Sequence, residues 1–346
     1  MKKTIKINFR YFWEGFNPED NFFTDLLKKE YKVVISDEPD YMFYSIYDEP
    51  KGGAVDLSKK GDFIKKISPP TYRFLRKAYP KLKNILKGTR TKIPEGDFKR
   101  FLYVAEHIRI DKEDIDDCVV GCDLAFSSWS EELIGHPKHF KLPMHRVTSY
   151  GLSNNGKPLI TKDIDMEQIK KEKVKFCNFI YSNDIKARND FFTLLNEYKR
   201  VDSPGRCMTN MTAISHDNPK KSRSSFDWSK EKEEFIKQYK FTIAFENKSE
   251  QGLITEKLID PMLVNSIPIY IGHESVKDEF NTKSFINYHD FNNMDDFIKY
   301  IIKVDTDDEL YEKILREPFY LETGPDKSMD DNRILEAMKE EIVWEK

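Results

Sequence analysis

A short stretch of the chain gathers two carboxylates, an amide and a lysine behind an apolar run. The run covers 241–245, a turn ends at Gly252, and an apolar helical pattern at 258–264 precedes a second apolar run at 267–271. This order predicts strand, polar turn, helix and strand, which is a βαβ unit. Ligands of open α/β sheets bind outside the carboxyl ends of strands, and a helix start there suits a phosphate. The polar residues at this end are Glu246, Asn247, Thr255, Glu256 and Lys257.

A second expected strand is also followed by a polar turn and a helix start, and this helix start contains an arginine. The apolar strand expected at 175–181 leads into a turn with Ser182 and Asn183, and Arg188 opens the next helical pattern. A guanidinium is a planar fork of donors, so at a helix start near a strand end it suits a diphosphate. The alternative is a surface arginine held in an ion pair.

A third carboxylate ends an apolar strand in the first half of the chain. The sequence FLYVAEH, at 101–107, delivers Glu106 to the carboxyl end of the expected strand. A carboxylate in such a place can act as a general base toward a hydroxyl group. The alternative is a surface carboxylate at a strand end.

Three stretches resemble a known family, and one of them is FLYVAEH, since the family has an apolar strand that leads to a Glu. The sequence FENKSEQGLITEK is similar to the donor-binding signature of the α-1,3/4-fucosyltransferases, glycosyltransferase family 10, which reads F-E-N-S, a variable loop and Y-x-T-E-K. The run from Val201 to Cys207 resembles the family's V-D-x-Y-G-x-C, with Pro204 at the aromatic position. Leu253 stands where the family has a tyrosine.

The resemblance implies a fold and an activity. The fold class would be α/β of the GT-B type, with two Rossmann-like domains facing across a cleft. The reaction would be an inverting transfer of L-fucose from GDP-β-L-fucose to a GlcNAc- or Glc-containing glycan, giving an α-1,3 linkage. Two alternatives stay open: a related transferase that uses another GDP-sugar, which Leu253 motivates, and a non-catalytic glycan- or nucleotide-binding module.

The resemblance also implies roles for single residues. Glu106 would be the catalytic base, because attack comes from the domain opposite the nucleotide. Arg188 and Lys257 would balance the charge of the GDP leaving group, Glu256 would bind the ribose or fucose, and Asn247 would support the sugar. The other expected donor-site residues are Ser182, Asn183, Thr255 and Glu246, and for Glu246 a buried, hydrogen-bonded position is expected as well.

No metal and no other cofactor is expected. Transferases of the GT-B type generally work without a metal, whereas a metal-dependent site would use a D-x-D pair. Such pairs occur at 114–116, 163–165 and 305–307, but none follows a clear strand, and a chain with 60 acidic residues contains them by chance. The sequence therefore predicts no metal ligands.

The pattern of elements predicts two α/β domains. We expect an acceptor-binding domain at 1–150 with a basic insertion at 59–100, a linker at 151–172 rich in Gly, Asn and Pro, a donor-binding domain at 173–310, and a helical tail at 311–346. The expected strands of the first domain are 5–9, 32–35, 41–45, 99–103 and 119–126. Those of the second are 175–181, 241–245, 268–272 and 285–288.

The composition of the chain indicates where in the cell the protein is expected. The 346 residues are 39% hydrophobic and 34% charged, and no apolar run approaches the ~18 residues that span a bilayer. Four scattered cysteines favour a reduced, cytoplasmic location. The insertion at 59–100 holds 14 Lys or Arg against three acids with amphipathic spacing, which suits the inner face of an anionic membrane or an acidic patch of the protein itself. No nucleic-acid-binding module accompanies it. The expected acceptor is a cell-surface glycan of a bacterium, such as a lipopolysaccharide O-antigen, or its lipid-linked precursor.

Overall fold

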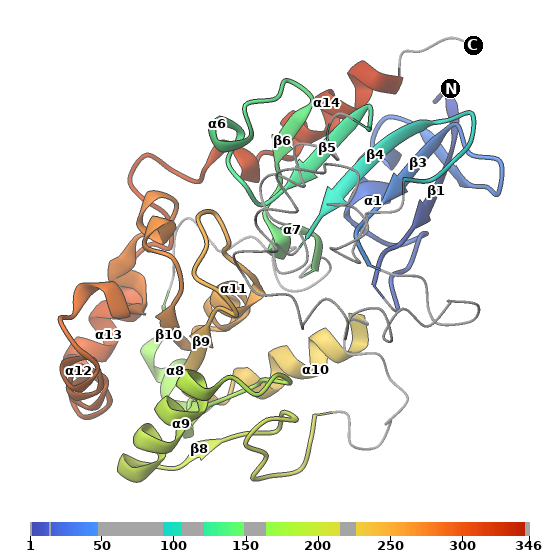
Figure 1. The fold of residues 1–346 in the computed structure, drawn as a ribbon. Coiled ribbons are helices and arrows are strands. Elements are labelled where there is room, and N and C mark those ends of the chain that lie inside the picture. Colours follow the sequence, from blue (N-terminus) through green and yellow to red (C-terminus); the bar gives the residue numbers. More distant parts are fainter. Residues whose placement is uncertain are drawn as a thin grey trace, which may run out of the picture.

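The computed structural model describes residues 2–13, 15–47, 93–105, 119, 121–148, 164–214 and 226–342. Within these residues the chain forms two parallel β-sheets, each with helices around it (Figure 1). The first sheet has the strand order β2-β1-β3-β4-β5-β6, and the second has the order β11-β10-β9-β7-β8. Every strand pair in both sheets is parallel. The expectation of two α/β domains is therefore confirmed at the level of the fold.

The first sheet is built from short strands whose inner positions are apolar. In β1 the residues Ile5 and Ile7 are buried, whereas Thr4 and Lys6 beside them are exposed, as a period of two requires. The central strands are buried along most of their length because elements cover both faces. The strands are β1 Thr4–Arg10, β2 Lys32–Ile35, β3 Tyr41–Tyr44, β4 Lys99–Val104, β5 Leu124–Ser127 and β6 His139–Lys141.

Aromatic side chains form the core beneath this sheet. Phe23 of helix α1 contacts Phe43 and Tyr103 at ring-centroid distances of 5.1 and 5.4 Å. Asn21 starts α1, since its side chain accepts hydrogen bonds from the N–H groups of Phe23 and Thr24. The helices of this part of the chain are α1 Phe22–Lys28, α6 Glu131–Ile134 and α7 Met144–Thr148.

The second sheet carries a separate core. Its central strand β9 pairs with β10 on one side and with β7 on the other, and its apolar residues from Phe241 to Phe245 are all buried. The strands are β7 Lys175–Asn178, β8 Val201–Asp202, β9 Tyr239–Phe245, β10 Ile267–Ile271 and β11 Ile286–Asn287. The helices are α8 Met166–Glu172, α9 Lys186–Tyr198, α10 Phe226–Ile236, α11 Glu256–Leu263, α12 Met294–Thr306 and α13 Asp308–Arg316.

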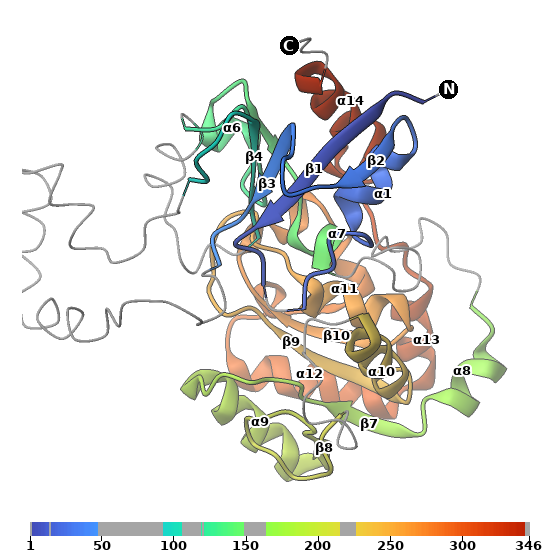
Figure 2. The same cartoon turned by 90° about the vertical axis from the view of Figure 1, so that its right-hand side faces the viewer.

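The C-terminal helix α14, Asp331–Ile342, returns to the first sheet (Figures 1 and 2). Its apolar residues Ile334 and Met338 are buried in the core of the first domain, and the hydroxyl of Tyr41 donates to the carbonyl of Ile342 at 3.1 Å. Helix α13 instead packs in the second core, where its Tyr311 is buried. The range expected as one helical tail therefore serves both domains.

Two expected segments overlap regular elements of the structure, one of which is the strand expected at 99–103. The described end of the expected linker contains helix α8, which Asp165 caps. The last basic residues of the expected insertion, Lys99 and Arg100, belong to β4, and Lys99 pairs with Glu341 of α14 at 2.5 Å. The rest of the insertion up to 92 lies outside the described residues, so its membrane role stays a prediction.

Direct contacts join the two domains. Lys141 at the end of β6 pairs with Glu279 of the second domain at 2.7 Å, and both side chains are nearly buried. Gly252 has φ +77°, and a Cβ there would meet the carbonyl oxygen of Ser128 at 2.7 Å, so this turn approaches the first domain more closely than other residues allow.

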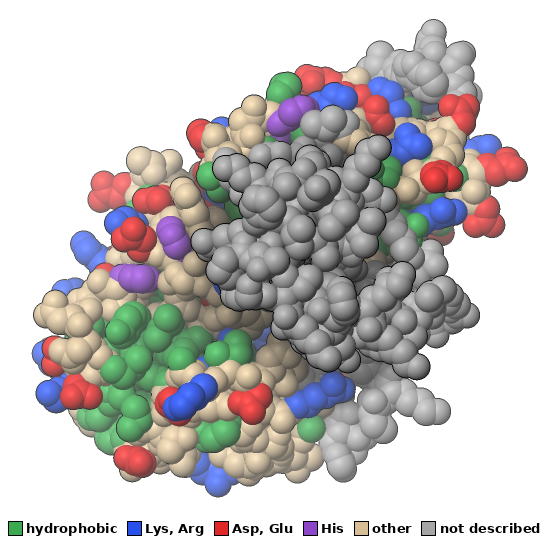
Figure 3. Space-filling view, viewed as in Figure 1, with side chains coloured by type: hydrophobic (Ala, Val, Ile, Leu, Met, Phe, Trp, Pro, Cys, Tyr) green, Lys and Arg blue, Asp and Glu red, His purple; other side chains and the backbone are tan. Residues whose placement is uncertain are grey.

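The visible face of the first domain carries mixed charges, while hydrophobic side chains gather on the second at the lower left (Figure 3). Within the described ranges, no helix is long and apolar enough to cross a membrane.

Candidate active site

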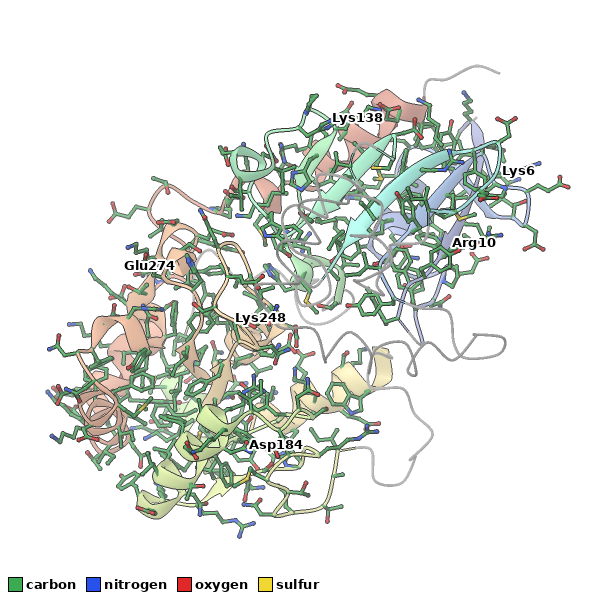
Figure 4. All side chains as sticks on the ribbon, in the orientation of Figure 1. Lys6, Arg10, Lys138, Asp184, Lys248 and Glu274 are labelled. Atoms are coloured by element: carbon green, nitrogen blue, oxygen red, sulfur yellow. The ribbon has the colours of Figure 1, made fainter. Side chains whose placement is uncertain are left out.

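A cavity of about 360 Å³ lies where the two domains meet. Residues of both domains line it, which places it at the carboxyl ends of strands from both sheets. The first domain contributes Trp13, Tyr47, Met144 and Thr148, which follow strands β1, β3 and β6. Figure 4 shows the direction: the chain runs along β1 from Lys6 to Arg10 toward the middle of the molecule, where Lys248 of the loop after β9 also lies.

The expected donor residues mostly meet in this cavity. Lining residues of the second domain include Ser182, Asn183, Arg188, Asn247, Glu256 and Lys257. They come from the loops after β7 and β9 and from the first turns of α9 and α11. Two expected residues, Thr255 and Glu246, are buried behind the cavity wall.

Arg188 is buried, with 2% of its surface exposed. Its Nη2 donates to Asn247 Oδ1 at 2.9 Å and to the carbonyls of Phe245 and Glu246 at 3.3 Å, while the guanidinium lies 3.8 Å from the ring centroid of Tyr181. Its Nε and Nη1 are buried without a hydrogen-bond partner in the described part of the chain. Burial lowers the pKa of Arg188, although Tyr181 and Glu246 oppose this. A buried cation with unused donors beside a cavity is complementary to an anion.

Tyr181 fixes the position of this guanidinium. Its hydroxyl accepts from the N–H of Phe245 at 2.6 Å and donates to the carbonyl of Ile243 at 2.9 Å. Burial raises the pKa of Tyr181 well above that of an ordinary phenol. The ring is therefore a neutral, rigid surface on which Arg188 stacks.

Glu246 organises the start of α11 from behind. Its carboxylate accepts from the N–H of Thr255 at 2.9 Å and from the Thr255 hydroxyl at 2.8 and 2.9 Å, and it lies 3.6 Å from Lys257 Nζ. Thr255 is in turn the N-cap residue of α11 and accepts from the N–H of Lys257. Burial raises the pKa of Glu246, with Lys257 opposing this. The structure thus gives Glu246 the buried, hydrogen-bonded position that was expected, away from the cavity surface.

Glu256 carries a firmly ionised carboxylate at the cavity. Burial alone would raise its pKa, but Lys257, Lys232 and a backbone N–H at the helix start outweigh this and bring the pKa to about 2. Lys257 Nζ lies 3.4 Å from its Oε1, and its Oε2 is buried without a partner in the described residues. Such a carboxylate accepts hydrogen bonds from neutral donors such as sugar hydroxyls.

Sequence reasoning missed one wall of the cavity. Helix α10 lines it with Trp228, Ser229 and Lys232, and the facing helix α11 adds Asp260. Lys232 Nζ lies 2.6 Å from Asp260 Oδ2, and both side chains are largely buried. The amphipathic pattern before β9 and the pairing of a Trp with a Lys four residues later were the signals for this wall. The aromatic Trp13 just after β1 is a comparable signal in the first domain.

The expected base, Glu106, follows the last residue of β4 by two positions in the sequence. This strand lies between β3 and β5, ends at Val104, and runs parallel to β1 and β3, whose following residues line the cavity. The chain therefore leaves β4 on the cavity side of the sheet. Glu106 itself lies outside the described residues, so its role stays a prediction.

Several acids of the D-x-D pairs cap helices or form ion pairs in the structure. Asp165 caps α8, Asp307 caps α13, and Asp305 pairs with Lys199 and Lys240 at 2.9 and 3.1 Å. Among the residues that the structure describes, no cluster of three or more His, Cys, Asp or Glu is placed to hold a metal ion.

Comparison with known proteins places these features in a family. A sequence model described as "Glycosyltransferase family 10 (fucosyltransferase) C-term" matches residues 169–321, and one described as "Alpha-(1,3)-fucosyltransferase FucT N-terminal domain" matches residues 7–52. A crystal structure of an α1,3-fucosyltransferase with GDP-fucose superposes over 100% of this chain and 92% of its own, with a TM-score of 0.63 and 22% identity.

Curated relatives agree with this placement. The α-(1,3)-fucosyltransferase FucT of Helicobacter pylori is 38% identical over 144 residues, which is 41% of this chain and 27% of that protein. The α-(1,3)-fucosyltransferase B of Drosophila melanogaster is 34% identical over 129 residues, 36% of this chain and 28% of its own. The human GDP-fucose protein O-fucosyltransferase 3 is 31% identical over 154 residues, 44% of this chain and 30% of its own. The matched part thus spans less than a third of these relatives' own length.

The fold defines a protein of the GT-B class, with two parallel-sheet domains and a cavity lined by residues of both. The two family models together match more than half of the chain, which belongs to glycosyltransferase family 10, the fucosyltransferase family.

Proposed function

We propose that the chain is a metal-independent, inverting α-1,3-fucosyltransferase that uses GDP-β-L-fucose. One observation carries the proposal: Arg188 is buried at the interdomain cavity with two donor nitrogens unpaired in the described residues. A diphosphate bound in the cavity offers oxygens to which this guanidinium can donate. The names of the relatives from H. pylori and human, which concern fucosyl transfer, support fucose as the sugar.

The leaving group is held by cations. Arg188 and Lys257 both line the cavity, and α11 begins there with its backbone N–H groups. Charge that develops on GDP as the glycosidic bond breaks is stabilised by these fixed groups. Two cations and a helix start can do this work without a metal ion, which is why we propose metal independence.

The transfer itself needs a base on the other side of the sugar. The acceptor oxygen attacks the anomeric carbon as its bond to GDP breaks, and the configuration inverts from β to α. We propose that Glu106 removes the proton of the attacking hydroxyl. The course of β4 toward the cavity supports this, because Glu106 follows two residues after the end of that strand.

Leu253 stands where the family has a tyrosine, so the choice of donor sugar needs its own test. This leucine is buried, with 3% of its surface exposed, and it is absent from the described lining of the cavity. Titration of the protein with GDP-fucose and GDP-mannose by calorimetry tests the choice of sugar. Tighter binding of GDP-fucose supports the proposal, and tighter binding of GDP-mannose favours a related transferase.

The proposed acceptor is a glycan that contains GlcNAc or Glc, or its lipid-linked precursor, reached in the cytoplasm or at the inner membrane face. Names of the matched relatives include both α-(1,3)-fucosyltransferases and protein O-fucosyltransferases, so the acceptor is the point to test. A glycan and peptide acceptor screen with GDP-fucose, followed by linkage analysis, does so. An α-1,3 product on a glycan supports the proposal, whereas products on peptides alone contradict it. GDP binding without release of any product favours a binding module.

A further inference from the structure

Helices α10 and α11 form one wall of the cavity. Several polar side chains of this wall are not needed to bind a phosphate. Each helix presents positions i, i+1 and i+4 to the cavity: Trp228, Ser229 and Lys232 on α10, and Glu256, Lys257 and Asp260 on α11. The two helices pack beside one another, and Lys232 bridges them through its 2.6 Å contact with Asp260. An ammonium and a carboxylate thus lie side by side in the cavity wall.

Removing both charges from water is costly, and a hydrophobic pair of similar size often serves stability equally well. The side chain of Lys232 is only 12% exposed and that of Asp260 only 5%. Their position at a ligand cavity gives this pair a use beyond stability. A carboxylate accepts several hydrogen bonds and an ammonium has three donors, so both groups can contact a ligand in addition to each other.

Helix α11 brings groups suited to different parts of a nucleoside diphosphate onto one wall of the cavity. Lys257 and Glu256 stand in the first turn, where the proposed diphosphate and ribose bind, and Asp260 lies one helical turn, about 5 Å, further along. The base follows the ribose in the ligand, and a nucleotide that runs along this wall brings its base to Asp260 and Lys232. Trp228 lies on the same wall, with its ring 5.8 Å from Lys232 Nζ, and offers an aromatic surface.

We propose that Asp260 and Lys232 read the guanine edge of the donor nucleotide. This inference rests on the proposed use of a GDP-sugar. The carboxylate accepts from guanine N1–H and the 2-amino group, while the ammonium donates to O6, one of the acceptors that distinguish guanine. Uracil presents a single N–H between two carbonyls, and adenine presents an amino group where guanine has O6. The pair therefore selects a guanine nucleotide and rejects both others.

Base analogues test the pair directly. Calorimetry would compare GDP with inosine diphosphate, which lacks the 2-amino group, and with xanthosine diphosphate, which has a carbonyl in its place. We expect the wild type to bind GDP at least about 10-fold more tightly than either analogue, since each leaves a charged acceptor unpaired. Equal affinity of the wild type for GDP and inosine diphosphate overturns the proposal without any variant.

Two substitutions give opposite signatures. Asp260→Asn replaces one acceptor with an amide donor, so we expect affinity for GDP to fall and affinity for xanthosine diphosphate to rise, each by about 10-fold. Lys232→Met removes the donor to O6, which both GDP and inosine diphosphate carry, so both should weaken while their ratio stays the same. A gain of xanthosine diphosphate binding cannot arise from misfolding.

The controls separate this proposal from the general assignment of the donor site. Lys186→Met removes an exposed lysine of α9 that pairs with Asp190, and it should change none of these affinities. If the wild type prefers GDP but Asp260→Asn weakens GDP and xanthosine diphosphate in parallel, the pair only supports the helices and the inference fails. If the wild type binds none of the three diphosphates, the proposed function fails as well.

Discussion

Arg188 is the side chain on which the proposed binding of GDP depends most. Its Nη2 is used for protein contacts, whereas Nε and Nη1 have no partner in the described residues. We predict that Arg188→Lys weakens GDP binding about 10- to 100-fold, because an ammonium lacks the planar shape and the five donors of the guanidinium and cannot contact both Asn247 and the diphosphate as it does. Calorimetry with GDP measures this, and Lys186→Ala on the same helix is the matched control. Unchanged GDP affinity in Arg188→Lys would show that the diphosphate does not bind at Arg188.

The ionised carboxylate of Glu256 should make the stability of the protein depend on pH. Its pKa of about 2 in the folded protein lies below the ordinary 4.5, so the folded state favours its ionised form. Its contribution to stability is present above pH ~4.5 and is lost as pH falls toward ~2; at pH ~3.5 about 1 kcal/mol is gone. Urea unfolding at pH ~6 and ~3.5 should show a smaller loss for Glu256→Gln than for the wild type. Equal losses in the two proteins would show that the carboxylate is not held ionised.

The first turn of α11 is the element that presents the donor groups. Thr255 caps it and binds the buried Glu246, so one hydroxyl serves both the helix and the loop after β9. We predict that Thr255→Ala lowers the free energy of unfolding by about 1–2 kcal/mol, the usual cost of a lost N-cap, and that it weakens GDP binding as Lys257 shifts. Urea denaturation measures the first effect. Thr255→Ser keeps the hydroxyl and should restore most of both; if it behaves like Thr255→Ala, the capping account is wrong.

Sequence reasoning predicted most strands because their apolar runs are uninterrupted, as in β2 and β9. It also found the loops after β7 and β9, since polar residues behind a buried strand are a local signal. It missed the α10 wall, because Lys232 meets Asp260 only after two helices pack together, over a separation of 28 residues. It missed Trp13 and Tyr47 for the same reason, since the cavity they line is created by the meeting of two domains.

At the scale of the whole molecule, the placement of the domains depends on buried charges. Lys141 of the first domain pairs with Glu279 of the second at 2.7 Å, and their side chains are 8% and 12% exposed. Burial raises the pKa of Glu279, while Lys141 opposes this. We predict that Lys141→Met costs about 2–3 kcal/mol of stability by leaving this carboxyl unpaired, and that adding Glu279→Gln recovers part of the loss.

A double-mutant cycle measured by urea denaturation gives the coupling, which should be about 1–3 kcal/mol. The exposed pair Lys277–Glu274 of the neighbouring segment is the control, with a coupling below about 0.5 kcal/mol. Equal couplings for the two pairs would mean that the interdomain charge pair does not hold the domains together.

The proposed reaction needs both domains at once, because the second would hold the GDP-sugar and the first would supply the base. The most direct test compares Glu106→Gln with the wild type for GDP affinity and for acceptor-dependent GDP release from GDP-fucose. We predict unchanged GDP affinity and a fall in turnover of about 10²-fold or more, the usual cost of losing a general base. Wild-type turnover in Glu106→Gln would contradict the account.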